Sequence, residues 1–300
     1  MAMRVLNFGS LNIDHTYRVD HIAAPGETVA AESLSYAPGG KGLNQSIALA
    51  RTGLPTFHAG CVGRDGQMLT DTLRDAGVHT DYLIPVEEIN GHAVIQVSRD
   101  GQNCIFIHGG SNQSLTAEQA ERILSGFIED TVVLMQNETS QVAHIAEKCR
   151  ELGIPLAFNP SPFTPDLTEG FPFDAVRYLL VNETEGQELS GGHTPDQIAD
   201  ILMRRYPEMH IILTLGSHGV YYAGPAGRIR QDAFIVDTVD TTGAGDTFTG
   251  FFLGLLLQGY QVSDALRHAC AAAALSVTVA GAAPSIPQME AVKAFLRERQ

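Results

Sequence analysis

Tryptophan is absent from this 300-residue chain, and cysteine occurs only four times. No two cysteines form a CxxC pair, which argues against a zinc site or a disulfide framework and favours a reducing compartment. They are Cys61, Cys104, Cys149 and Cys270. The N-terminus also lacks the apolar run of a signal peptide, so we expect a cytoplasmic protein.

Long hydrophobic runs and basic residues are scarce. The most apolar stretches, Phe251–Leu257 and Ala269–Ala283, are shorter than the roughly 20 residues that span a bilayer. We therefore expect no membrane segment and interpret both stretches as buried helices. The 19 Lys and Arg residues are outnumbered by 34 Asp and Glu, which gives a formal net charge of -15. Because such a surface repels a phosphate backbone, we expect no nucleic-acid partner.

Short β-rich runs alternate with helical patterns along the chain, which is typical of βαβ units and a largely parallel sheet. Apolar spacing predicts helices over Gly42–Thr52, Thr116–Ile128 and Gln141–Leu152, the last capped by Gly153. We expect a single α/β domain over residues 1–300. The predicted strands are Val5–Gly9, Phe57–Val62, Val132–Met135, Leu156–Phe158, Tyr178–Val181 and Ile211–Leu215.

Two segments interrupt this alternation. Residues 14–38 are far longer than an ordinary strand-to-helix loop and contain two strand-like stretches, Thr16–Val19 and Thr28–Tyr36. Residues 91–108 predict a hairpin with its turn at Asp100-Gly101. The two excursions can form one small β-sheet lid over the carboxyl ends of the main strands, where α/β folds bind ligands. Two unrelated surface loops are the alternative.

The strongest motif is DTTGAGD, residues 240–246, which leads into an apolar helical pattern. Gly243 and Gly245 let the backbone approach a ligand where a helix begins, and free N–H groups there suit a phosphate. Asp246 beside such an anion hole makes sense as the base that takes a proton from an attacking hydroxyl. On spacing alone, a capping Asp in the first turn explains the motif equally well.

Four weaker motifs follow strands or begin helices. GGKGLNQ, residues 39–45, can hold a polar ligand, but it is not a Walker A loop, and a glycine-rich helix start explains it as well. NETE, residues 182–185, can position Mg²⁺ or form an Asn turn before a helix. In SLNIDH, Asn12 and Asp14 point the same way in an extended chain and can hold sugar hydroxyls, with a plain turn as the alternative. Glu138 is another strand-end carboxylate. The eleven histidines show no metal-binding spacing and are expected to be structural or surface groups.

Taken together, these motifs resemble the ribokinase family of carbohydrate kinases, also called the PfkB type. GGKGLNQ resembles the first signature of that family, and DTTGAGDTFTG resembles its highly specific second signature. The resemblance extends over essentially the whole chain. The remaining motifs occur in the family's order: SLNIDH, MQNE (135–138), NPSP (159–162), NETE and TLGSHGV (214–220).

The resemblance implies a doubly wound α/β fold with a largely parallel sheet, helices on both faces and a β lid. It also implies ATP, Mg²⁺ and K⁺ as cofactors and a homodimer formed through the lids. The implied base is Asp246, and the implied anion hole is Gly243, Ala244 and Gly245. The sugar would be bound by Asn12, Asp14, Gly40, Lys41, Asn44 and Glu138. The nucleotide would contact Asn182, Thr214, Gly216, Ser217, Gly219 and Cys270, with Glu185 helping to place Mg²⁺. The K⁺ loop would be formed by Asp240, Thr242, Ser276, Val279, Gly281 and Ser285.

Within that family the sugar-site residues favour D-ribose, so we expect ATP-dependent phosphorylation of its 5-hydroxyl. Kinases of 2-keto-3-deoxygluconate usually carry GGD in place of GGK, and sugar-phosphate kinases usually begin with an NP-type motif. Two residues depart from the family pattern: Cys270 stands where a His is common, and His92 replaces a small hydroxyl residue.

Three alternatives remain. One is a kinase for another small sugar or a nucleoside, such as deoxyribose, fructose or an adenosine-like acceptor. A second is a catalytically silent sugar-binding regulator on the same fold, against which the intact Asp246 and glycine loop argue. The third, a dinucleotide-dependent dehydrogenase, is weakened by the absence of GxGxxG after the first strand.

Overall fold

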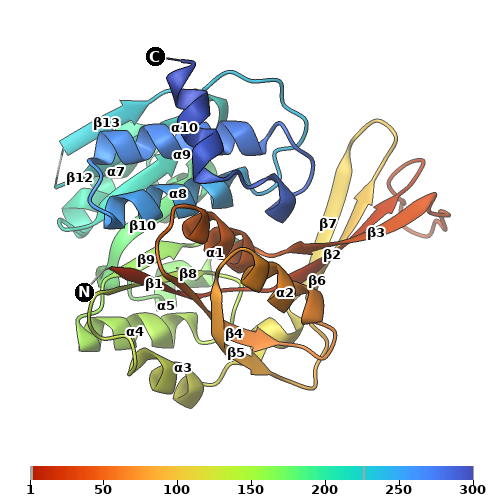
Figure 1. Cartoon of the computed structure of the whole chain (residues 1–300), viewed down its shortest axis with the longest axis horizontal. Helices are drawn as coiled ribbons and strands as arrows, with labels where there is room; N and C mark the ends of the chain where they lie inside the picture. The colour runs from red at the N-terminus through yellow and green to blue at the C-terminus, as the bar shows by residue number, and fades with distance from the viewer. Residues whose placement is uncertain (1–2, 226, 300) are drawn as a thin grey trace.

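The structure is a computed structural model that describes residues 3–225 and 227–299. Within them a nine-stranded sheet has the order β13-β12-β11-β10-β9-β8-β1-β4-β5 (Figure 1). Neighbouring strands are parallel from β5 to β11, and the β11–β12 and β12–β13 pairs are antiparallel. The strands are β1 (Arg4–Phe8), β4 (Thr56–Val62), β5 (His79–Pro85), β8 (Thr131–Gln136), β9 (Leu156–Asn159), β10 (Val176–Asn182), β11 (His210–Thr214), β12 (Val220–Gly224) and β13 (Gly227–Gln231).

Helices cover both faces of this sheet because its strands are apolar on both sides. Val5 of β1 belongs to one buried cluster and the next residue, Leu6, to the other. The first cluster includes α1 (Lys41–Arg51), α2 (Gln67–Asp75), α8 (Ala244–Leu257), α9 (Val262–Ser276) and α10 (Met289–Arg297). The second includes α3 (Ala117–Leu124), α4 (Val142–Leu152), α5 (Asp166–Gly170), α6 (Glu183–Ser190) and α7 (Pro195–Arg205). The expected doubly wound fold is confirmed.

The six strands predicted outside the two excursions all lie in the main sheet, and the three predicted helices are α1, α3 and α4. Gly153 caps α4 with φ 69°, as expected. The sequence reading missed β5 and the β12–β13 hairpin. The structure also includes four short 3-10 helices: η1 (Gly110–Gln113), η2 (Phe173–Ala175), η3 (Gly216–His218) and η4 (Ala283–Ser285).

The expectation of a helix over Ala269–Ala283 was partly wrong. The helix α9 ends at Ser276, and Val279 beyond it is exposed. The Thr278 hydroxyl donates to the Leu275 carbonyl, and such a side-chain bond competes with helix continuation. Gly281 then adopts a left-handed φ of 85°. Among the described residues, no helix has the length and apolarity needed to cross a membrane.

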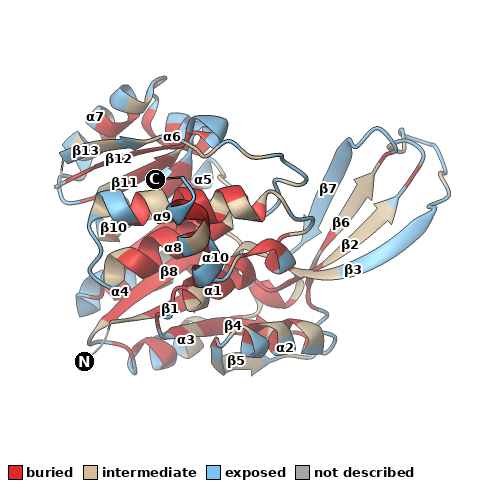
Figure 2. Cartoon of the chain, turned by 45° about the horizontal axis from the view of Figure 1, so that its top comes forward, coloured by how far each residue is buried: buried red, intermediate tan, exposed pale blue. Residues whose placement is uncertain are grey.

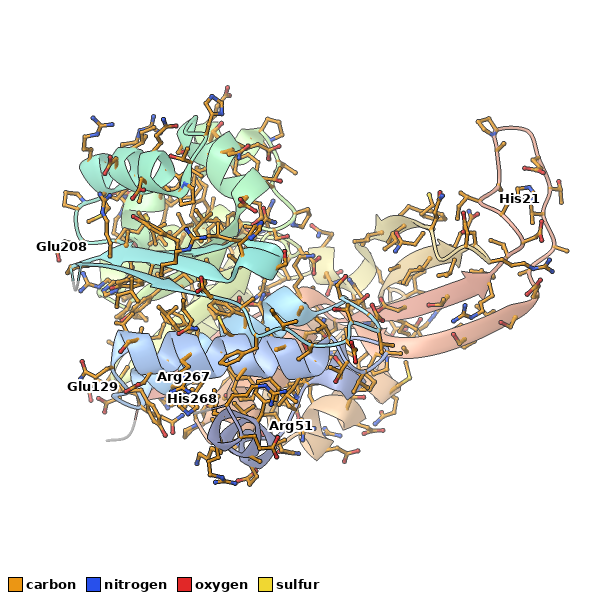
Figure 3. All side chains as sticks on the ribbon, turned by 90° about the horizontal axis from the view of Figure 1, so that it is seen from above. His21, Arg51, Glu129, Glu208, Arg267 and His268 are labelled. Atoms are coloured by element: carbon orange, nitrogen blue, oxygen red, sulfur yellow. The ribbon has the colours of Figure 1, made fainter. Side chains whose placement is uncertain are left out.

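The two excursions form one four-stranded sheet, hereafter the small sheet, in the order β3-β2-β6-β7. Its strands are β2 (Asn12–Arg18), β3 (Ser33–Gly39), β6 (Gly91–Val97) and β7 (Asn103–His108). The small sheet projects from the main body in Figure 1, and Figure 3 shows His21 at its far end. The predicted strand at Thr28 begins later, at Ser33, because its partner β2 ends at Arg18.

The order of strands reverses at β1, since β4 and β5 lie on one side of it and β8 to β11 on the other. Loops that follow β1 and β8 therefore diverge and leave a crevice at the carboxyl edge of the sheet. The small sheet starts from the same edge, because β2 follows β1 after three residues. This topology predicts a ligand site where β1, β8 and β2 meet.

Candidate active site

Three chain segments meet at the crevice through the Glu138 carboxylate, which follows β8. Its Oε2 accepts hydrogen bonds from the Ser10 hydroxyl after β1 and, at 3.1 Å, from the Lys41 backbone N–H. Its Oε1 lies 3.1 Å from Lys41 Nζ in a largely buried ion pair. Burial alone would lower the pKa of Lys41, but the Glu138 and Asp246 carboxylates outweigh it and raise the pKa. The lysine is therefore held as a cation.

Helix α1 can begin at this point because of two glycines. Gly40, its N-cap, has φ 95°, a conformation that favours glycine. A Cβ on Gly42 would lie 2.2 Å from the Ser10 backbone nitrogen. The start of α1 thus packs directly on the loop after β1, which fixes Lys41 and Asn44 beside the crevice.

Asp246 lies in the first turn of α8 and faces α1. Asn44 Nδ2 donates to its Oδ2 at 3.0 Å, and Gln45 Nε2 donates to its Oδ1 at 2.9 Å. Burial raises the pKa of Asp246, while Lys41 and these two donors act in the opposite direction. A half-buried carboxylate held by two donors is an oriented proton acceptor.

A second carboxyl group, Asp14 of β2, lies near Glu138 and Lys41. Burial, together with the Glu138 charge and against the Lys41 charge, raises the pKa of Asp14 to about 6. A Cβ on Gly39 would lie 2.3 Å from an Asp14 oxygen, so the glycine leaves room for the carboxyl group. The neighbouring Asn12 is buried, and its Oδ1 accepts from Asn112 Nδ2 at 2.8 Å.

A polar cavity of about 230 Å³ connects Asp246 and Lys41 to the start of α8. Gly243 caps α8 with φ 74°, and a Cβ there would lie 2.9 Å from the Ala282 side chain. Gly243 and Gly245 line the cavity. The Ala244 N–H already donates to the Thr241 carbonyl at 3.2 Å, so it can serve an anion only by exchanging that bond.

A larger, mostly apolar cavity of about 430 Å³ shares Thr214 and Gly245 with the polar one. It lies between the end of β11, the segment after β13, and helices α8 and α9. Its volume and apolar walls suit a flat heteroaromatic ring. All five residues that the sequence placed there for a nucleotide line it: Thr214, Gly216, Ser217, Gly219 and Cys270.

Asn182 and Glu185 form a capping box at the start of α6. Asn182 Oδ1 accepts the Glu185 N–H at 2.9 Å, and Glu185 Oε2 accepts the Asn182 N–H at 3.0 Å. NETE therefore forms the Asn-led helix start that is its structural alternative. Both residues also line the polar cavity, so the cap does not remove them from the site.

The segments expected to form a K⁺ loop do meet. Asp240 Oδ2 accepts the Gly281 N–H at 2.8 Å, and its Oδ1 accepts from the Thr242 N–H at 2.9 Å and the Thr242 hydroxyl at 2.6 Å. Burial would raise the pKa of Asp240, but these bonds outweigh it and lower the pKa. The Ser276 carbonyl accepts from the Val279 N–H. The Val277 carbonyl accepts from the N–H groups of Val239 and Asp240. Direct hydrogen bonds thus join the two segments.

The described residues contain no group of three or more His, Cys, Asp or Glu that could hold a metal by itself. Mg²⁺ typically uses one or two protein carboxylates and completes its shell with phosphates and water. The Glu185 carboxylate beside the polar cavity fits that mode of binding.

The sequence motifs contained further site residues whose roles they did not reveal. Gln45 contacts Asp246 and Asn159, and Ser10 contacts Glu138. All three belong to quoted motifs, GGKGLNQ, NPSP and SLNIDH. Their roles depend on contacts across 114 to 201 residues of chain. No local pattern carries that information.

Comparison with known proteins agrees with this geometry. The sequence profile of the pfkB family of carbohydrate kinases matches residues 3–289. The chain belongs to this family. Among curated pfkB-type relatives, the ribokinase of Bacillus subtilis is 34% identical over 292 residues, covering 96% of this chain and 97% of the relative. The deoxyribokinase of Salmonella typhi is 29% identical over 306 residues, covering 98% and 99%.

A solved structure supports the same assignment to the family. The Arabidopsis thaliana ribokinase, complexed with ribose and ATP, superposes with a TM-score of 0.85. It is 31% identical, and the match covers 99% of both chains. The chain is thus similar to ribokinases in sequence and in fold over nearly its whole length.

Proposed function

We propose that this chain is an ATP-dependent sugar kinase that transfers the γ-phosphoryl group to the 5-hydroxyl of D-ribose. The observation that carries the proposal is the place of Asp246. Its carboxylate accepts a hydrogen bond from Asn44 on the sugar side and lines, together with Lys41, the polar cavity that adjoins the apolar one. The ribokinases among the relatives, and the Arabidopsis structure with ribose and ATP, support the choice of substrates.

The sugar side of the site offers groups that can hold several hydroxyls. Asn44 Oδ1 is buried and has no hydrogen-bond partner among the described residues, so a hydroxyl donor from the sugar can satisfy it. Asp14 and Glu138 can accept hydrogen bonds from sugar hydroxyls, and Lys41 can donate one. We assign the sugar to these four residues, with Asn12 and Gly40 shaping the same wall.

The nucleotide side begins in the apolar cavity. The purine would lie against Cys270 and the segment after β13, with Thr214 to Gly219 along its edge. The phosphates would then extend through the polar cavity to the first N–H groups of α8, where the helix dipole favours anions. Asn182 would contact the phosphates, and Glu185 would help to hold Mg²⁺, which supplies charge neutralisation for phosphoryl transfer.

In the reaction, Asp246 accepts the proton of the sugar hydroxyl while the hydroxyl oxygen attacks the γ-phosphorus of ATP. The bond between the γ-phosphorus and the oxygen that leaves with ADP then breaks. Asn44 and Gln45 keep the carboxylate aimed. The N–H groups of Gly243, Ala244 and Gly245 would stabilise negative charge on the transferred group. Lys41 adds positive charge near Asp246.

We also propose a K⁺ ion near the Asp240 loop, held by carbonyls of Asp240, Thr242, Ser276, Val279 and Gly281 together with Ser285. The support is the anionic Asp240 carboxylate where the two segments meet just before α8. K⁺ should raise kcat or lower a substrate KM relative to tetramethylammonium at equal ionic strength. Equal activity in the two salts, after K⁺ has been removed from the protein and nucleotide stocks, would reject the proposed K⁺ ion.

The small sheet is proposed as a lid and as the interface of a homodimer. It starts at the sugar side of the site, where Asp14 of β2 lies. Its strand β7 is exposed at all six residues, including Ile105, Phe106 and Ile107. The exposed apolar side chains of the small sheet need to be covered, and a second copy of the chain would cover them.

We propose a cytoplasmic location for the protein, because the free thiols of its four cysteines fit a reducing compartment.

A panel of acceptors tests the function. We expect D-ribose to show the highest kcat/KM among pentoses, hexoses and nucleosides with ATP. Deoxyribose is the second candidate, because a deoxyribokinase is among the full-length relatives. A clear preference for a hexose or a nucleoside would reject D-ribose while leaving the kinase class intact.

A further inference from the structure

Beneath the candidate site lies a connected set of buried polar side chains, of which the proposed mechanism uses only Gln45. Asn7 of β1, Gln45 of α1 and Gln136 of β8 have no exposed surface. Gln136 Nε2 donates to Gln45 Oε1 at 2.7 Å and to Asn7 Oδ1 at 3.0 Å. Buried amides of this kind are costly unless they are paired, so their arrangement calls for a reason.

The orientation of each amide follows from partners that can only accept. Asn7 must direct Nδ2 at the Gly42 carbonyl, 2.8 Å away, because a carbonyl donates nothing. The Asn7 Oδ1 therefore faces Gln136 and can only accept, so Gln136 must donate to it through Nε2. The same Nε2 also donates to Gln45, so Gln45 must turn its Oε1 towards Gln136. The other end of the Gln45 amide, Nε2, is thereby left for Asp246.

Two further anchors impose the same polarity. His58 Nε2 lies 3.1 Å from the Gly9 carbonyl and must carry its proton there, which leaves Nδ1 to accept from the Ser46 hydroxyl. Ser46 Oγ then accepts from Asn7 Nδ2 at 2.8 Å, in agreement with the first anchor. On the other side, Asn159 Nδ2 donates to the Leu180 carbonyl at 2.9 Å, so its Oδ1 accepts from Gln45 Nε2.

One atom shows what this arrangement costs. Gln136 Oε1 is buried and has no hydrogen-bond partner among the described residues. Reversing the Gln136 amide would not remove the problem, because an oxygen would then face the oxygens of Asn7 and Gln45. The network therefore leaves Gln136 Oε1 unpaired, and the same arrangement fixes the orientation of the Gln45 amide.

We propose that Gln45 is a positioning residue for Asp246, and that Gln136 and Asn7 act on Asp246 through the orientation of the Gln45 amide. A fixed donor on Oδ1 favours the carboxylate and holds it in one rotamer, which is what a general base requires. The charged groups that also face this region are Lys41 of α1 and Glu138 after β8, with Glu185 of α6 near Lys41. The catalytic consequence rests on the proposed role of Asp246, whereas the effect on its titration does not.

The test replaces amides by Met, which keeps the chain length and removes the hydrogen bonds. The pKa of the Asp246 carboxyl is measured by NMR of ¹³C-labelled aspartate, assigned with Asp246→Asn, in the full-length protein. Gln45→Met should raise that pKa by about one unit, the size expected for one lost bond to a charged group. Gln136→Met should raise it by roughly half as much, because Asn159 still orients Gln45.

The decisive comparison is the double variant. Because Gln136 acts through Gln45, adding Gln136→Met to Gln45→Met should leave the pKa of Asp246 where the single Gln45→Met variant has it. In activity assays, Gln45→Met should lower kcat about ten-fold while the sugar KM changes less than about two-fold, as for an orienting group. The acid limb of the kcat profile should move to higher pH with it.

Thr56→Val is the matched control. Thr56 is equally buried, on β4, and its hydroxyl donates only to the Leu54 carbonyl at 2.9 Å among the described residues. It should leave the pKa of Asp246 and the pH profile unchanged. If Gln45→Met does not fold, Asn7→Leu should raise the pKa of Asp246 as Gln136→Met does, and less than additively when the two are combined.

An unchanged pKa of Asp246 in the folded variants would overturn the proposal. It would also be overturned if Gln136→Met shifted the pKa of Asp246 by the same amount in the wild type and in the Gln45→Met background. Full activity of Asp246→Asn would instead reject Asp246 as the base and leave the titration result standing. The two failures are therefore distinguishable.

Discussion

The main sheet and the small sheet treat their side chains in opposite ways. Every residue of β8 is buried, and its polar Gln136 is fully enclosed and hydrogen-bonded. Every residue of β7 is exposed, although Ile105, Phe106 and Ile107 are apolar. Figure 2 shows the contrast between the red central strands of the main sheet, such as β8, and the pale-blue strands at both edges of the small sheet.

This difference indicates different tasks. Helices of the same chain cover both faces of the main sheet, and its buried Gln136 donates to Asn7 and to Gln45 of α1, which contacts Asp246. The small sheet leaves apolar side chains uncovered, which is typical of a surface that meets a partner. If the tasks are separate, changes at Asp246 should alter chemistry without altering assembly, and changes on β7 should act on assembly first.

The largest expected effect is that of Asp246→Asn. The change keeps the shape, removes the basicity and leaves one of the two facing amide donors without its oxygen. We expect kcat to fall by at least roughly 10²–10⁴, the usual range for a general base, with sugar KM changed far less. The sedimentation coefficient should stay that of the wild type.

Asp81→Asn, an exposed position on β5, serves as its control and should show normal turnover. Near-normal kcat in folded Asp246→Asn would remove Asp246 from the chemistry.

The next largest effect is expected on the small sheet. Phe106 lies in one cross-strand row with Val94, His15 and Tyr36, so it belongs to an extended surface. Phe106→Asp should weaken the proposed dimer at least about 30-fold, as expected for an interface hot spot. Sedimentation equilibrium at several concentrations measures the dissociation constant.

Asn103→Asp places the same charge on the same strand and should leave the dimer intact. A wild-type monomer at micromolar concentration, or a Phe106→Asp variant that assembles normally, would contradict the separation of tasks.

The smallest effect concerns stability against acid. Burial lowers the folded pKa of His58 to about 4 from an ordinary 6.5. Between about pH 6.5 and pH 4, His58 is therefore protonated in the unfolded chain and neutral in the folded chain. The free energy of unfolding consequently falls as the pH drops through this range. His58 contributes at most about 3 kcal/mol to that fall. Burial lowers the pKa of His210 in the same way, also to about 4.

Urea unfolding at pH 7.5 and pH 5.0 measures the fall in wild type and in His58→Asn. The variant should lose less stability between the two pH values. An equal loss would show that His58 does not titrate between the folded and unfolded states.

The sequence predicted what depends on local order. The period of apolar residues located α1, α3 and α4, and the motifs contained Lys41, Asn182, Glu185, Thr214 and Asp246, which line the two cavities. The motifs did not include the segment after β13 that also lines the apolar cavity. The sequence missed what depends on distant partners. Neither the parallel pairing of β2 with β6 nor the contact of Gln45 with Asp246, 201 residues apart, leaves a trace in a short stretch of sequence.

Local chemistry also misled in one place. Ala269–Ala283 is apolar enough to suggest a continuous helix, but the run Val277–Val279 contains three β-branched residues and a hydroxyl that bonds to the backbone. The chain therefore leaves α9 at Ser276 and turns towards Asp240. The end of that helix is what brings the proposed K⁺ segments together.

The central claim is that this site transfers phosphate from ATP to one particular hydroxyl of D-ribose. The most direct measurement is to incubate the protein with D-ribose, ATP and Mg²⁺ and to identify the product by ³¹P and ¹H NMR. The account predicts a phosphomonoester whose phosphorus couples to the two C5 protons, formed in step with ADP and not formed by Asp246→Asn. Phosphorylation at another carbon, or ADP release without a sugar phosphate, would contradict it.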